Sequence, residues 1–96
     1  MTIKYKNVYI DDTYTICGNY ENDGPLSKYF DKKYKKDLYF DEKSWEKAEV
    51  HLIKEANKNI LNKNKLKEED IDFLISGDLQ NQIAASDYMA RDFNIP

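Results

Sequence analysis

The densest group of polar side chains that could bind a ligand lies near the C-terminal end of the sequence. The stretch Asp78-Leu79-Gln80-Asn81-Gln82 places one carboxylate and three carboxamides directly after an apolar run. Carboxamides both donate and accept hydrogen bonds, and α/β sheets bind ligands beyond the carboxyl ends of their strands. We therefore expect Asp78, Gln80, Asn81 and Gln82 to form a loop that binds a ligand or lies beside its site. The alternative is a structural loop that caps the following helix through Asp78 or Asn81.

Two other residue types could support catalysis, but their surroundings in the sequence argue against it. Cys17 follows a strand-like stretch and precedes a turn, with no helix N-terminus or base to activate it, so we expect a small core residue. His51 lies on a helix flank with no acidic or sulfur partner that we identify at a functional spacing, so we expect no catalytic or metal-binding role. Phosphate-binding glycine loops, nucleophile elbows and metal-ligand spacings are absent. The sequence predicts no catalytic residue, no metal and no cofactor.

Charge and composition limit the class of partner. The 96 residues carry a net charge of −3 with both signs interleaved, which disfavours nucleic acid. The basic run Asp31–Asp37 is diluted by acids, so we interpret it as a solvated surface and assign it no function. One cysteine fits a reducing, intracellular compartment. No apolar run approaches the ~20 residues that span a bilayer, and no signal peptide is visible, so any membrane association should be peripheral.

The clearest element that could position the polar loop is a helix from Ser44 to Asn62. Ser44 is suited to cap its first turn, and apolar residues then recur at helical spacing. We expect this stripe to be buried, with Trp45 as its largest anchor. The stripe consists of Trp45, Ala48, Leu52, Ile53, Ala56 and Ile60.

The segments around the polar loop complete a β–α–β–α order. The short apolar run Ile71–Ser76, stopped by Gly77, predicts a buried strand, and the preceding helix would make a right-handed crossover to it. A second helix is expected from Ile83 to Phe93. Its inward residues should be Ala85, Tyr88 and Met89, with an Asp87–Arg91 pair outside.

The N-terminal third is less regular. Val8–Cys17 predicts one strand, perhaps bulged, or two short ones. Gly18–Pro25 has the composition of a flexible loop. Leu26–Asp31 predicts a helical turn that packs Leu26, Tyr29 and Phe30 against the body of the domain. The core of the domain should then be the βαβα region at about residues 44–96.

Three blocks of the sequence resemble one protein family. They are "GPLSKYFD" (Gly24–Asp31), "DEKSWEKAE" (Asp41–Glu49) and "LKEEDIDFLISGDLQNQIAASDYMARDFNIP", which ends at Pro96. In this order, and with "SGDLQNQ", they are similar to the N-terminal region of the stage V sporulation protein AD family of spore-forming bacteria. The resemblance covers nearly all of the chain and about the first quarter to third of a family protein. We therefore expect residues 1–96 to be a single, incomplete thiolase-like N-terminal region.

The resemblance implies a fold class and a function. The fold would be the α/β, five-layered αβαβα arrangement of thiolases, without condensing activity. The full-length protein would bind dipicolinic acid, with its calcium, for uptake into the developing spore. It would act peripherally at the spore inner membrane, on the cytoplasmic side, beside other stage V sporulation A membrane proteins. The remaining alternative is the N-terminal part of a thiolase-like or β-ketoacyl synthase-like acyl-transfer enzyme.

The same resemblance places the usual reactive cysteine of thiolase-like proteins beyond Pro96, and Cys17 does not match it. A strand that is apolar on both faces also needs more cover than 96 residues supply. We therefore expect the isolated chain to self-associate or to be partly molten.

Overall fold

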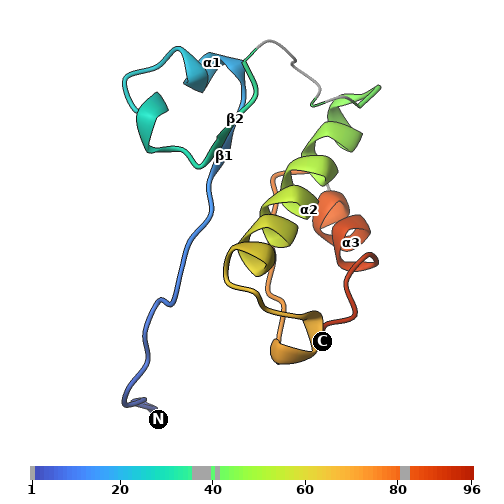
Figure 1. Cartoon of the computed structure of the whole chain (residues 1–96). Helices are drawn as coiled ribbons and strands as arrows, with labels where there is room; N and C mark the ends of the chain where they lie inside the picture. Colours follow the sequence, from blue (N-terminus) through green and yellow to red (C-terminus); the bar gives the residue numbers. More distant parts are fainter. Residues whose placement is uncertain (1, 36–39, 41, 81–82) are drawn as a thin grey trace.

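The computed structural model describes residues 2–35, 40, 42–80 and 83–96, and Figure 1 shows their arrangement. The elements follow one another as β1 (Ile16–Cys17), α1 (Asn19–Asn22), the 3-10 turn η1 (Ser27–Tyr29), β2 (Lys32–Lys33), α2 (Trp45–Lys63), the 3-10 turn η2 (Glu68–Asp70) and α3 (Ala84–Ala90). Helices α2 and α3 lie side by side (Figure 1), and Lys32 of β2 forms an ion pair with Glu55 of α2.

Helix α2 confirms the longest element expected from the sequence. The side chain of Ser44 accepts a hydrogen bond of 3.2 Å from the amide of Lys47, so it caps the first turn as predicted. Ala48 is buried, and the apolar side chains that follow it along the stripe are half-buried. Trp45 is the exception, because 57% of its surface is exposed. The expectation that Trp45 anchors the stripe is wrong, since more than half of its surface is open to solvent at the first position of α2.

Helix α3 is shorter than the sequence predicted. Ile83 has a left-handed backbone (φ 57°), so the helix starts at Ala84. Beyond Ala90 the amides of Asp92 and Phe93 bond only three residues back, which ends the α-helical pattern. Its buried side chains are Ala85, Ser86 and Met89.

The core lies between these two helices. Met89 is completely buried, and the side-chain amide of Asn57 on α2 donates a 3.0 Å hydrogen bond to its sulfur. The inward positions of Ala85 and Met89 are thus confirmed. Tyr88 was expected inside, but it is 56% exposed because it lies on the rim of the helix pair.

The segment Ile71–Ser76 is extended but is not a strand, which corrects the predicted β–α–β–α order. Leu74 donates its amide to the carbonyl of Pro96 at 2.7 Å, and no ladder forms along this part of the described chain. Ile71 and Leu74 face a small cavity of about 130 Å³ beneath α2, whereas Phe73 and Ile75 are 75% and 93% exposed. The expected buried strand is missing because the described residues offer it no neighbouring strand and cover only one of its faces.

The strand pairing is found at the N-terminal end instead. Ile16 pairs with Lys32 and Cys17 with Lys33 in a parallel, two-stranded sheet. Only the end of the predicted strand Val8–Cys17 therefore pairs, and β2 lies in the basic run to which no element was assigned. The fold class is mixed α/β, with helices and a small parallel sheet.

The link between β1 and β2 is more ordered than expected. Helix α1 occupies the middle of the predicted loop Gly18–Pro25, and its Asn22 amide bonds the carbonyl of Gly18 at 3.0 Å. Turn η1 confirms a helical turn within Leu26–Asp31. Leu26 and Tyr29 are nevertheless exposed, by 57% and 68%, because the small sheet provides too little surface to cover them.

Candidate functional site

Asp78 of the predicted binding loop accepts two backbone hydrogen bonds. One carboxylate oxygen accepts the amide of Gln80 at 2.9 Å, and the other accepts the amide of Ser86 at 2.6 Å. Desolvation raises the pKa of Asp78, but hydrogen bonds from the Ser86 side chain and amide and from the Gln80 amide outweigh it, so the pKa lies below its ordinary value. Asp78 therefore stays ionised and fastens the loop to the first turn of α3. This is the capping role that the sequence left as the alternative.

Gln80 lies at the edge of a groove between α2 and α3. Its side-chain amide donates to the carbonyl of Glu46 at 3.4 Å, which ties the loop to the start of α2. The groove has a volume of about 580 Å³. It is lined by Ser44, Glu46, Lys47, Val50, Lys54, Gln80, Ala84, Tyr88, Arg91 and Asp92.

This groove, which we call the α2/α3 groove, combines an aromatic ring with several charges. The Arg91 guanidinium lies 4.8 Å from the centre of the Tyr88 ring, a cation–π contact. Lys54 forms an ion pair of 2.5 Å with Asp92 and holds the pKa of that carboxyl below its ordinary value. Three cationic side chains line the groove against two carboxylates, although the whole chain has a net charge of −3. The groove is thus locally more cationic than the chain.

Four other residues singled out in the sequence are Asn81, Gln82, Asp87 and Arg91. Asn81 and Gln82 lie outside the described residues. Asp87 and Arg91 are both exposed, as expected for the outer face of α3. Arg91 is found against the Tyr88 ring, a contact that the i,i+4 spacing to Asp87 did not suggest.

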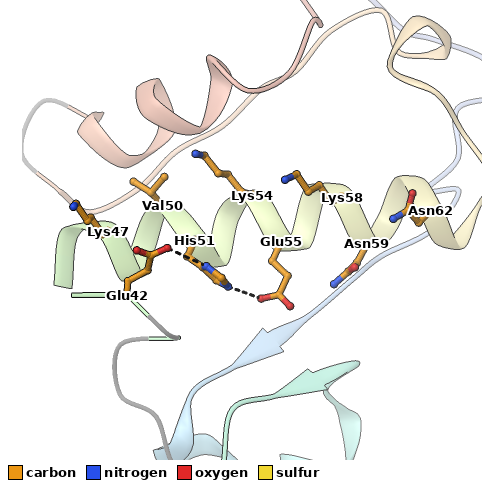
Figure 2. A pocket seen from close by; sticks show the side chains of 9 residues that line it. All are labelled: Glu42, Lys47, Val50, His51, Lys54, Glu55, Lys58, Asn59 and Asn62. Carbon is orange, nitrogen blue, oxygen red and sulfur yellow. Dashed lines mark hydrogen bonds and ion pairs between the residues drawn. The ribbon is translucent and has the colours of Figure 1, made fainter. Parts of the chain in front are cut away.

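A second groove, of about 630 Å³, runs along α2 and contains the histidine (Figure 2). His51 Nδ1 lies 3.4 Å from a Glu42 oxygen, and His51 Nε2 lies 3.2 Å from a Glu55 oxygen. Its Nε2 also lies 3.0 Å from the hydroxyl of Tyr34, which follows β2. We call His51, Glu42, Glu55 and Tyr34 the His51 cluster.

The His51 cluster corrects the expectation that His51 has no acidic partner. The missed signal was Glu55, four residues further along the same helix, where side chains share a face. Glu42 could not be identified as a partner in the same way, because it precedes α2 and is brought close only by the chain's path into the helix. Within the part of the chain that the structure describes, no group of three or more histidine, cysteine or acidic side chains has a geometry suited to a metal ion.

Cys17 behaves as the sequence predicted. Its thiol is buried, and only 4% of the residue is exposed. Burial raises the pKa of the Cys17 thiol, and the negative charge of Glu21 raises it further. Since the thiolate is the reactive form, Cys17 is a poor nucleophile. Among the described helices, none is long and apolar enough to cross a membrane.

Comparison with known proteins confirms the resemblance inferred from the three sequence blocks. The family model described as stage V sporulation protein AD matches residues 1–96. Stage V sporulation protein AD of Bacillus subtilis (strain 168) is 42% identical to this chain over 89 residues. The match covers 93% of this chain and 26% of that relative, so the chain spans about a quarter of the relative's length.

Proposed function

Because this chain belongs to the stage V sporulation protein AD family, we propose that it forms the N-terminal region of a sporulation protein that binds dipicolinic acid, with its calcium, for uptake into the developing spore. The whole protein would have a thiolase-like fold. It would act at the cytoplasmic side of the spore inner membrane, beside other stage V sporulation A membrane proteins. The chain would supply one wall of the ligand site rather than all of it.

The chemistry of the α2/α3 groove is the observation that supports this proposal. Dipicolinic acid is a flat aromatic ring with two carboxylates. Such a dianion needs cationic or amide donors, and an aromatic neighbour suits its ring. The groove offers the Tyr88 ring, the Arg91 guanidinium and the Gln80 carboxamide within one cavity. The loop that continues from Gln80 into Asn81 and Gln82 would add further amide donors.

The same groove argues for a shared rather than a complete site. Lys54 is already paired with Asp92, and Arg91 already covers Tyr88, so neither cation is wholly available to a dianion. The remaining donors, Lys47 and Gln80, are too few to match two carboxylates. Residues 1–96 alone should therefore bind dipicolinic acid too weakly to detect.

Within residues 1–96, Cys17 does not support acyl transfer, the alternative activity for a thiolase-like chain. Acyl transfer of that kind requires an activated cysteine, and the pKa of the buried Cys17 is raised rather than lowered. We propose that the chain has no catalytic role of its own.

Titration calorimetry with dipicolinic acid and calcium tests the proposal on the full-length family protein that carries this chain. The wild type should bind, and residues 1–96 alone should not. Replacing Asn81→Ala together with Gln82→Ala should weaken binding about tenfold or more if each lost hydrogen bond contributes ~1 kcal/mol. Arg91→Gln should weaken it by a similar factor.

Lys6→Gln is the matched control, because it also removes one exposed cation but lies outside the groove. It should leave the affinity unchanged. A full-length wild type that does not bind contradicts the function. Unchanged affinity in both the Asn81/Gln82 double variant and Arg91→Gln, with a wild type that binds, would keep the function but remove the polar loop and the groove from the site.

A further inference from the structure

We propose that the His51 cluster holds the N-terminal unit against α2 through ion pairs and hydrogen bonds that depend on the protonation of His51. We call this pH-dependent attachment the latch. The N-terminal unit is defined as residues 16–34, which contain β1, α1, η1 and β2. Helix α2 contributes His51 and Glu55, the approach to α2 contributes Glu42, and the end of the N-terminal unit contributes Tyr34. One imidazole thus lies where the two parts of the chain meet (Figure 2).

The hydrogen-bond geometry of the cluster suits a protonated imidazole. Glu55 and the Nε2 atom of His51 are 3.2 Å apart, and both also lie within hydrogen-bond reach of the Tyr34 hydroxyl. If Nε2 carries no proton, two acceptors face each other and compete for the single phenol proton. In the other neutral tautomer Nε2 donates to Glu55, but Nδ1 then faces the Glu42 carboxylate without a proton. If both ring nitrogens are protonated, Nδ1 donates to Glu42, Nε2 donates to Glu55, and Tyr34 keeps its own bond to Glu55. Protonation therefore satisfies every contact in the cluster.

Further polar contacts join the N-terminal end of the chain to α2, and the buried Phe40, on the approach to α2, packs against the Tyr34 ring with 4.7 Å between ring centres. Lys32 pairs with Glu55, so the same carboxylate is used twice. Asn59 donates to the Tyr14 hydroxyl at 3.2 Å, and Asp12 accepts from Lys63 at 3.1 Å and from Asn64 at 2.8 Å. A two-residue ladder such as β1/β2 has little stability of its own. The charge on His51 can thus shift the balance between attached and detached states.

Other charges near His51 do not cancel this effect. The charged and titratable groups that face it or line its groove are Lys32, Tyr34, Glu42, Lys47, Lys54, Glu55 and Lys58. Lys47, Lys54 and Lys58 project from α2 away from the strands, whereas His51 and Glu55 project toward them (Figure 2). The two carboxylates are therefore the nearest charges to the ring.

The sign of the pH effect follows from this arrangement. Histidine side chains change charge between about pH 5 and 8. The latch is closed while His51 is protonated and its carboxylates are ionised, and it loosens as pH rises and the ring loses its proton. Protonation of Glu42 and Glu55 in stronger acid also loosens it. The N-terminal unit should be most firmly attached in mildly acidic solution.

Amide hydrogen exchange of this chain, corrected for the intrinsic effect of pH, tests the latch. The Lys32 and Tyr34 amides bond to Thr15 and Cys17 across the strand pair, so they report on the N-terminal unit. Their protection should fall about two- to fivefold between pH 6 and pH 8, the range expected for a partly exposed ion pair. The ring signal of His51, the single histidine of the chain, should change together with this protection.

The variants distinguish a latch from a packing contact. His51→Gln should abolish the pH difference, and Glu42→Gln should reduce it while leaving the imidazole and α2 intact. Lys58→Gln, a groove residue that projects away from the strands, should retain it. Equal protection at both pH values in the wild type overturns the latch. So does a pH difference that survives in His51→Gln or is undiminished in Glu42→Gln.

Discussion

The carboxylate of Asp78 accepts a hydrogen bond of 2.6 Å from the backbone amide of Ser86, eight residues further along the chain. Its other oxygen accepts the Gln80 amide, so one side chain fixes both the turn of the polar loop and the start of α3. Amides in the first turn of a helix have no partner within the helix, and an outside acceptor satisfies one of them. The position of Gln80 at the α2/α3 groove therefore depends on Asp78.

Replacing Asp78→Ala should lower the melting temperature by about 2–5 °C, because both bonded amides lose their acceptor. Asp78→Asn should have a smaller effect, since one oxygen acceptor remains. Asp72→Asn, an exposed carboxylate on the preceding segment, is the control and should leave the melting temperature unchanged. Circular dichroism melts measure all three. An unaltered melt in Asp78→Ala would mean that α3 starts without this acceptor.

The stability contributed by Asp78 should also depend on pH. Its folded-state pKa lies below the ordinary value of 3.8, because its hydrogen bonds outweigh desolvation. A depressed folded-state pKa contributes stability that is present above the ordinary pKa and is lost as pH falls through the folded one. The wild type and Asp78→Asn should thus differ most above about pH 5 and should converge progressively as pH falls below the ordinary value of 3.8. Melting curves that stay parallel down to pH 3 would contradict this linkage.

Burial predicts opposite outcomes for two large apolar side chains. Met89 is completely buried between the helices, so Met89→Ala should lower the free energy of unfolding by about 2–5 kcal/mol. Trp45 is 57% exposed, so Trp45→Ala should cost less than about 1 kcal/mol despite its larger side chain. Urea unfolding of both variants gives the comparison. A larger loss in Trp45→Ala would restore Trp45 as the anchor that the sequence suggested.

The buried thiol should react slowly. Because burial raises the pKa of Cys17 and shields its sulfur, its reaction with a thiol reagent at neutral pH should be about tenfold or more slower in the folded chain than in denaturant. A reagent that releases a coloured product when it reacts with the thiol allows both rates to be measured by absorbance. Gly18→Ala changes the packing beside Cys17, since an added methyl group would meet the Phe40 ring at 3.4 Å. Similar rates in folded and unfolded chains would place the thiol at the surface.

The outward side of Ile71–Ser76 should cause self-association. Phe73 and Ile75 expose apolar side chains along an extended backbone, a surface on which another chain can pair. Replacing both with lysine should shift the chain toward a monomer in analytical ultracentrifugation, whereas Asp72→Asn on the same segment should not. A wild type that sediments as a compact monomer at high concentration would rule out this role.

Local signals in the sequence determined the features that depend on neighbouring residues alone. Ser44 and the three- and four-residue apolar spacing identified α2, since a cap and a helical stripe are formed within one segment. The capping alternative for Asp78 came from residue type and position, and the inward places of Ala85 and Met89 came from helical spacing. The three sequence blocks were likewise sufficient to identify the family.

Tertiary structure decided the features that depend on contacts between residues far apart in the sequence. The apolar run Ile71–Ser76 has strand composition, but a strand also requires a neighbour to pair with, and composition does not supply one. The exposure of Trp45 depends on which segments cover the start of α2, which is not encoded near Trp45. The His51 cluster and the α2/α3 groove each combine side chains from segments far apart in the chain, such as Tyr34 with His51 and Gln80 with Arg91. Only the folded chain brings such side chains together, because hydrogen bonds and ion pairs act over a few ångströms of space rather than over sequence distance.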